Sequence, residues 1–277
     1  MEYIDEIITR LNIDSRIQKL MNKEVKIPAY LDDFNSLSDY WYPHPPCLIP
    51  LFLGFGASYK GVINHFFCNR KNTYVEYFLE HGHISEIAIN ADQFITLMVL
   101  RMIITKDELT EEIISFCKQL DYKEYEEVEQ FVFDYGDDPE EFNNLVFFEQ
   151  SRPFKYLKSL NDYNGDFPSS IYILNNSEII QKSSVFEIAV TEKLSELQDL
   201  PPWLKNNTDK KALFNEYISN NQLKEAWFSL NAKGWLLKDV ADALEKLKVQ
   251  AKDDLFNLVA DNWINGWRRS TFLNGNY

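Results

Sequence analysis

Residues 47–90 read CLIPLFLGFGASYKGVINHFFCNRKNTYVEYFLEHGHISEIAIN. The segment divides into runs rich in aromatic and branched residues, and each run ends at Gly, Asn or His, which favour turns. Such closely spaced runs predict an antiparallel meander. In the run at 73–79, Tyr74 and Glu76 alternate with Val75 and Tyr77. The alternation predicts that one face of the sheet packs on the core.

Helical patterns flank these strands on both sides. Apolar residues recur at helical spacing between residues 4 and 20, with a break where Asp14 could cap a second helix. Asn90 resembles another N-cap, followed by Phe94 and Leu97 on one face of a helix that should cover the sheet. The expected fold class is therefore α+β, an antiparallel sheet meander flanked by helices.

The rest of the chain is expected to be mainly helical. Acidic amphipathic helices are predicted at 107–120 and 122–133, and a weaker strand-turn-strand-helix pattern occupies 166–197. The prolines near residue 200 resemble a linker, and four helical patterns follow. We therefore expect an α+β domain at 1–200, which includes the acidic helices, and a C-terminal helical region at 201–277.

The composition limits the classes of partner and compartment. The formal net charge of −15 argues against direct binding to nucleic acid, because phosphate binding depends on clustered Lys and Arg. The first residues lack a signal-peptide pattern, and no uninterrupted apolar run is long enough to span a membrane. Cys47, Cys68 and Cys117 are widely spaced, as expected of reduced thiols. These features predict a cytoplasmic protein.

The acidic residues are concentrated in one segment. Between residues 107 and 149 the sequence has 15 Asp and Glu against two Lys. We expect this surface to dock a basic protein partner, with contacts at the carboxylates Glu124, Glu126, Glu127 and Glu129. The alternative is a solvated face that only aids solubility.

A pair of aromatic residues ahead of the proline-rich stretch is a second candidate for contact with a partner. Trp41 and Tyr42 belong to the residue types that dominate interface hot spots. Burial under the sheet is the alternative explanation of their aromatic character. The sequence leaves both readings open.

The run Ile49–Gly56, followed by Tyr59-Lys60-Gly61, resembles the central signature of the SUKH superfamily. In that signature a strand begins at Ile-Pro and leads through a glycine turn to a second strand. Residues 75–78, 86–88 and 92–95 resemble the next strand pair and helix of the same family. The resemblance covers about residues 1–105. It departs at 25–30, where the acidic-x-Leu-Pro pattern of the family is incomplete.

The resemblance implies a non-enzymatic binding module. Many members of that superfamily are bacterial immunity proteins that neutralise a cognate toxin, often a nuclease, and others are regulators. We therefore expect an immunity protein that needs no cofactor or metal. A regulatory scaffold without a toxin partner is one alternative. The other is a hydrolase or metal-dependent enzyme that uses His81 and His83 with Glu80 on a hairpin tip.

Overall fold

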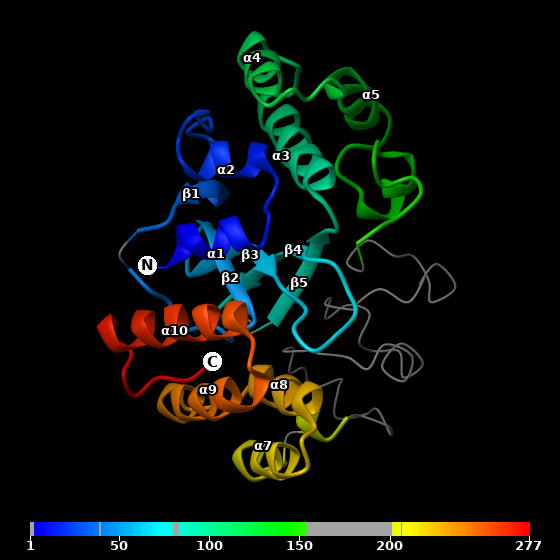
Figure 1. The fold of residues 1–277 in the computed structure, drawn as a ribbon. Coiled ribbons are helices and arrows are strands. Elements are labelled where there is room, and N and C mark those ends of the chain that lie inside the picture. The colour runs from blue at the N-terminus through cyan, green and yellow to red at the C-terminus, as the bar shows by residue number, and fades with distance from the viewer. Residues whose placement is uncertain (1–2, 39, 80–82, 154–200, 206) are drawn as a thin grey trace.

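The sheet of this protein lies between two groups of helices. The computed structural model describes residues 3–38, 40–79, 83–153, 201–205 and 207–277. Helices α3 to α5 lie at one end of the molecule and α7 to α10 at the other, with the strands between them (Figure 1). The α+β prediction is confirmed.

The N-terminal part contains two short helices, the sheet and three further helices. In chain order these elements are α1 (Ile4–Arg10), α2 (Ser15–Met21), η1 (Asp32–Phe34), β1 (Asn35–Ser36), β2 (Leu48–Leu53), β3 (Ser58–Ile63), β4 (Thr73–Phe78), β5 (His83–Ala88), α3 (Ala91–Lys106), α4 (Glu111–Gln119), α5 (Tyr125–Tyr135) and η2 (Pro139–Asn144). The C-terminal part contains η6 (Pro202–Leu204), α7 (Lys210–Ser219), α8 (Leu223–Asn231), α9 (Leu237–Ala251) and α10 (Asp254–Arg269).

The two predicted helix caps are present. The Asp14 side chain accepts a hydrogen bond from the backbone N–H of Arg16 and begins α2. The Asn90 side chain accepts from the N–H of Gln93 at 2.9 Å and begins α3. Both satisfy an N–H group that a helix leaves unpaired in its first turn.

The five strands form an antiparallel meander in the order β1-β2-β3-β4-β5. The register between β2 and β3 shifts between Pro50 and Phe52, as expected where proline supplies no N–H to the ladder. Gly61 lies opposite Pro50, and a Cβ at Gly61 would overlap the carbonyl oxygen of Ile49. The absence of a side chain at Gly61 therefore allows β2 and β3 to approach closely.

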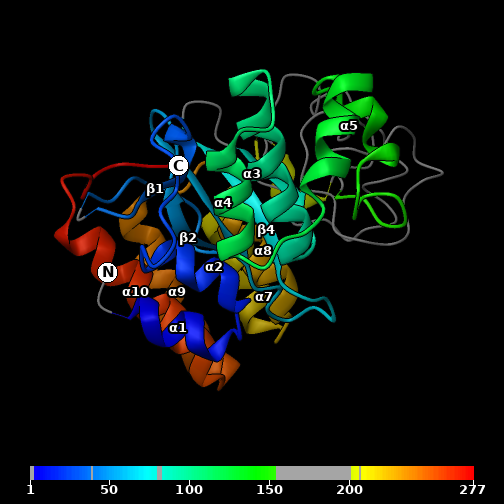
Figure 2. The ribbon, with the colours of Figure 1, turned by 90° about the horizontal axis from the view of Figure 1, so that it is seen from above.

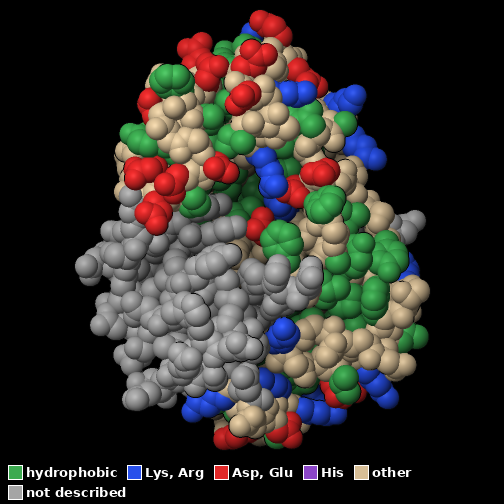
Figure 3. Space-filling view, turned by 180° about the vertical axis from the view of Figure 1, so that it is seen from behind, with side chains coloured by type: hydrophobic (Ala, Val, Ile, Leu, Met, Phe, Trp, Pro, Cys, Tyr) green, Lys and Arg blue, Asp and Glu red, His purple; other side chains and the backbone are tan. Residues whose placement is uncertain are grey.

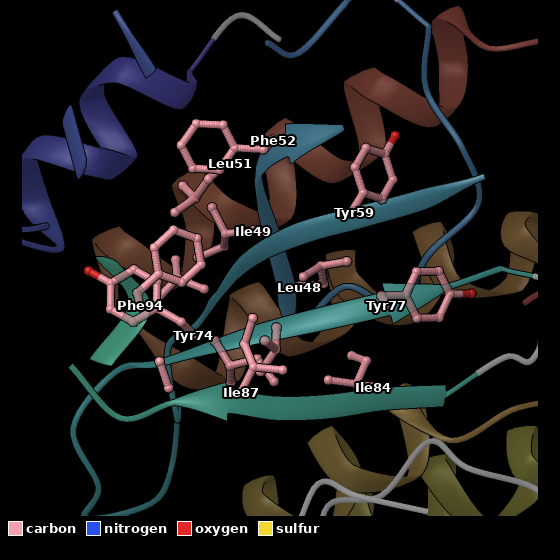
Figure 4. Packing of buried hydrophobic residues seen from close by; sticks show 14 of the residues in the cluster. Leu48, Ile49, Leu51, Phe52, Tyr59, Tyr74, Tyr77, Ile84, Ile87 and Phe94 are labelled. Atoms are coloured by element: carbon pink, nitrogen blue, oxygen red, sulfur yellow. The ribbon is translucent and has the colours of Figure 1, made fainter. Parts of the chain in front are cut away.

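One face of the sheet packs against α3 and η1. Phe94 of α3 lies 4.8 Å from the ring of Tyr74 and stacks on Phe52, with Phe34 of η1 completing the cluster. Figure 4 shows Phe94 and Tyr74 together at one end of the strands. In Figure 2, which views the molecule from the α3 side, α3 crosses over the strands and α5 stands to one side.

The C-terminal helices cover the opposite face. Phe66, in the loop after β3, contacts Phe256 of α10 with ring centroids 5.1 Å apart, and Phe256 contacts Trp227 of α8 at 5.3 Å. Tyr59 and Tyr77, which pair across β3 and β4, are both buried. The α3 face packs on the core as predicted, and the C-terminal helices bury the other face as well, which the alternation in the sequence did not predict.

Polar contacts also join the C-terminal helices to the N-terminal part. The backbone N–H of Cys47 donates to the Asn231 side chain at 2.8 Å, and Trp263 Nε1 donates to the carbonyl oxygen of His44 at 2.8 Å. The buried apolar residues of both parts form one hydrophobic cluster. The boundary near residue 200 stays a prediction, and the pattern predicted at 166–197 lies outside the described residues.

No described helix combines the length and the apolar composition that a membrane span requires.

The contact between α10 and Trp41 gives a test of this packing. A Cβ at Gly266 would lie 2.5 Å from both Cδ1 and Nε1 of Trp41. We expect Gly266→Ala to lower the free energy of unfolding by about 1–3 kcal/mol, because the overlap outweighs the helix preference of alanine. In a Trp41→Leu background the same change should become neutral or stabilising. Urea unfolding of the four proteins measures the cycle, and an equal loss in both backgrounds would contradict the contact.

His44 gives a pH-dependent test. Its Nδ1–H donates to the Tyr42 carbonyl at 2.7 Å, and burial lowers its pKa from 6.5 to about 4. Between about pH 6.5 and pH 4, His44 is protonated in the unfolded chain but neutral in the folded chain. His44 should therefore cost about 1.4 kcal/mol of stability per pH unit across that window.

The measurement is urea unfolding at several pH values between about 7 and 5, for the native protein and His44→Asn. The buried His65, whose pKa is also lowered, adds to the slope in both proteins. As the pH falls, the free energy of unfolding of His44→Asn should decrease less steeply than that of the native protein, by the slope that one proton contributes. Identical slopes would show that His44 titrates alike in the folded and unfolded chains.

Candidate functional site

The acidic helices border a groove on one side of α3. We use the term acidic groove for the hollow of about 710 Å³ lined by Ile103, Asp107, Glu108, Leu109, Glu126, Glu129, Gln130, Val132 and Phe133. The lining includes four carboxylates and no Lys or Arg. Figure 3 shows acidic side chains gathered over the end of the molecule where α3 to α5 lie, with hydrophobic side chains exposed among them.

Phe133 is the most exposed large apolar side chain of this region. Its side chain is 85% exposed, and it follows Glu126 by two helical turns on α5. An exposed aromatic ring bordered by carboxylates suits a partner that brings both apolar area and positive charge. The sequence alone does not single out this residue, because the apolar pattern of α5 makes every Phe in it a candidate for the core.

The four predicted contact carboxylates have different environments. Glu126 and Glu127 are exposed, whereas Glu124 and Glu129 are half-buried. Glu129 Oε1 accepts the backbone N–H of Leu109 at 3.1 Å, and Glu124 accepts the N–H of Lys123 at 3.0 Å. Glu129 therefore fixes the turn between α3 and α4 against α5. Only Glu126 and Glu127 can be reversed in charge without loss of such a bond.

The structure places Trp41 in the core. Trp41 is 6% exposed and packs edge-on against Trp263 at 5.5 Å, so burial is the reading that the structure favours. We therefore exclude Trp41 from the proposed contacts. Tyr42 is half-buried, with its ring 4.8 Å from that of the exposed Tyr40. Trp41 contacts Trp263 of α10, and Tyr40 contacts Phe272 just after it. Helix α10 lies at the other end of the molecule from α5 (Figure 1). The structure does not bring Trp41 or Tyr42 to the acidic groove.

A cluster of charged side chains around the buried Lys60, which the sequence did not lead us to expect, lies on the α3 face of the sheet. Lys60 of β3 is 3% exposed, and its Nζ lies 3.3 Å from Glu76 Oε2 and 3.6 Å from Asp33 Oδ2. Asp33 also pairs with Arg101 of α3, and its Oδ1 accepts the backbone N–H of Phe55 at 3.1 Å. The Lys60 ammonium lies 5.1 Å from the centre of the Phe34 ring. We call these four charged residues the ion cluster.

The ion cluster forms part of the wall of a pocket of about 790 Å³. We call it the sheet pocket, because strands β3 and β4 contribute to its wall together with α3 and η2. Its volume lies within the range of about 300–1,000 Å³ that is typical of ligand sites. The exposed residues Asp32, Phe55 and Asp137 also line it.

One signal in the sequence could have indicated the cluster. Lys60 and Glu76 interrupt otherwise apolar strands, and the meander pairs β3 with β4, so opposite charges facing each other on that pair were foreseeable. Asp33 and Arg101 come from a short 3-10 helix and from the exposed side of α3. Their meeting with Lys60 depends on the tertiary packing.

The thiols of Cys68 and Cys117 are poor candidates for nucleophilic catalysis. Burial raises the pKa of the Cys117 thiol to about 12 and also raises that of Cys68. Both remain protonated near neutral pH, where the thiolate would be the reactive form.

The described residues contain no group of three His, Cys, Asp or Glu side chains that could hold a metal ion. Glu80 and His81, on which the metal alternative depends, lie outside them.

We expect removal of Lys60, the central cation of the ion cluster, to destabilise the folded protein strongly. Lys60→Met should lower the free energy of unfolding by about 3–5 kcal/mol, because Glu76 and Asp33 would keep their charges in a buried site. Lys60→Met with Glu76→Gln should recover part of the loss. Lys118→Met on the exposed surface of α4 is the control. Urea unfolding measures all three, and a loss no larger than that of the control would show that the cluster is solvated.

Comparison of the chain with models of protein families, with curated proteins and with solved structures finds no match.

Proposed function

We propose that this protein is a non-enzymatic binding module for a basic protein, and that its partner is a toxin domain which it neutralises as an immunity protein does. The resemblance of residues 49–61 and 75–95 to the SUKH superfamily supports the class of function. The acidic groove supports the location of the interface and the charge of the partner.

The observation that carries the proposal is the placement of Phe133 beside the carboxylates of the groove. The acidic charge by itself does not indicate a binding site, because exposed carboxylates are stable in water without a protein partner. The ring of Phe133 lines the groove together with the half-buried Leu109 and Val132, and contiguous apolar area bordered by polar residues is typical of interaction sites. The groove therefore combines an apolar anchor with a field that attracts cations.

The groove is also fixed before binding. Its two walls, the α3–α4 turn and α5, are joined by the hydrogen bond from the Leu109 N–H to Glu129. Phe131, on the inner side of α5, is buried against Phe142. A preformed surface loses little conformational entropy on binding, which favours tight association with a folded partner.

The function of an inhibitor fits these properties. Several carboxylates on one side speed the encounter with a positively charged surface, and they disfavour acidic competitors. A basic surface is what a nuclease needs to hold the phosphates of its substrate. An acidic module that covers such a surface would block access of the nucleic acid.

We expect charge reversal in the groove to slow association. Glu126→Lys with Glu127→Lys should lower the association rate constant for the basic partner about tenfold or more at low salt and flatten its salt dependence. Phe133→Ala should mainly raise the dissociation rate constant, because the lost contact forms after encounter. The partner is first isolated from the native host. Its association is then measured by stopped flow with the two purified proteins.

A matched control separates the groove from the total charge. Glu216→Lys with Asp242→Lys changes the net charge by the same amount on exposed positions of α7 and α9. This control should slow association far less than the groove variant, and the melting temperatures of both should stay near that of the native protein. Equal slowing by the two pairs would contradict the groove as the docking surface.

A further inference from the structure

The charges that line the sheet pocket favour a positively charged ligand. Its lining contains Asp32, Asp33, Glu76 and Asp137 against Lys60 and Arg101, so that four formal negative charges face two positive ones. The two cations are both committed to the ion cluster through Asp33, and Lys60 also to Glu76. The excess negative charge comes from the exposed rim residues Asp32 and Asp137. The rim therefore attracts a cation.

Phe55 provides an aromatic surface at the same pocket. It lies in the turn between β2 and β3, and its side chain is 71% exposed. Its backbone is held by the hydrogen bond from its N–H to Asp33 Oδ1, and the hydroxyl of Ser58 donates to its carbonyl oxygen at 2.8 Å. An exposed aromatic ring on a backbone held in this way, in the same lining as the carboxylates of Asp32 and Asp137, is an arrangement that binds a cation over the face of the ring.

The remaining walls are apolar and accept the stem of a long side chain. Leu97, Leu100 and Ile104 of α3 line the pocket together with Ile87 of β5. Arginine combines an apolar stem with a planar cation that stacks on aromatic rings and pairs with carboxylates through two N–H groups. Its shape and charge match the wall, the ring and the rim together.

We propose that the sheet pocket binds an arginine side chain of the basic partner. The inference rests on the proposed function, because the acidic residues around η2 that should attract the partner include Asp137 of this pocket. The acidic groove and the sheet pocket lie along the same helix α3, and each contains residues from its C-terminal half. The partner would thus contact the protein at two places, through apolar contact at Phe133 and through an arginine at Phe55.

The test uses short peptides in which one central residue varies. The probe peptide carries arginine between glycines, and its matched control carries citrulline, which has nearly the same shape without the charge. A third peptide carries glutamate and a fourth carries lysine. Methyl NMR of Ile87, Leu97, Leu100 and Ile104 reports on the wall of the pocket, whereas the amide of Glu126 reports on the groove.

We expect saturable shifts of the pocket methyl groups with the arginine peptide, weaker binding of the lysine peptide and none of the citrulline or glutamate peptides. Phe55→Ala should weaken the arginine peptide about five- to thirtyfold, in keeping with a desolvated cation over a ring. Asp137→Asn should weaken it as well. Val249→Ala and Asp242→Asn, which change exposed residues on α9, are the matched controls and should have no effect.

Each remaining outcome decides a separate point. Equal binding of the arginine and citrulline peptides, or binding of the glutamate peptide instead, would overturn the inference. Shifts confined to the groove would overturn it and leave the proposed function standing. Selective arginine binding that survives Glu126→Lys with Glu127→Lys supports the pocket. If that variant then associates with the basic partner at the native rate, the proposed groove fails while the pocket remains.

Discussion

The arrangement of the α3 face depends on the neutralisation of one buried ammonium group. Lys60 lies in the middle of the sheet, where an unpaired charge would cost several kcal/mol. Its compensation requires Glu76 from the next strand and Asp33 from the segment before the sheet. Asp33 in turn holds Arg101 of α3 and the backbone of Phe55. A single carboxylate thus joins a helix, a turn and a strand, and it sets the geometry of the sheet pocket.

Burial of both sheet faces explains the aromatic content of this chain. A meander with one solvated face would expose every second residue of its strands. Here every described residue of β3 is buried, and of the described side chains of β4 only Glu76 and Phe78 are half-buried. The rings of Trp227, Phe256 and Phe66 close the second face. The C-terminal helices therefore complete the core that the meander begins.

The candidate binding surfaces follow from the way α5 and η2 are attached. α5 buries Val128 and Phe131 and leaves Glu126, Glu127 and Asp134 exposed, so these carboxylates are displayed on a helix that is anchored in the core. Like charges repel one another within such a cluster, and the basic partner that we propose would weaken this repulsion on binding. The aromatic residues Phe55 and Phe133 line the two hollows, and both hollows have residues of α3 in their walls.

Periodicity, caps and turn residues in the sequence determined the local elements of this protein. The meander, the capping roles of Asp14 and Asn90, and the acidic and C-terminal helices all follow from side-chain patterns within a few residues of each other. Contacts between distant segments decided the rest. Trp41 has the composition of a surface hot spot, yet it is buried because Gly266, more than two hundred residues later, leaves room for its indole ring. In the same way Glu129 differs from its neighbour Glu127 because the Leu109 amide lies within reach of its carboxylate. Lys60 and Asp33 meet because the chain folds back across β2. Patterns among neighbouring residues do not indicate contacts between positions so far apart in the sequence.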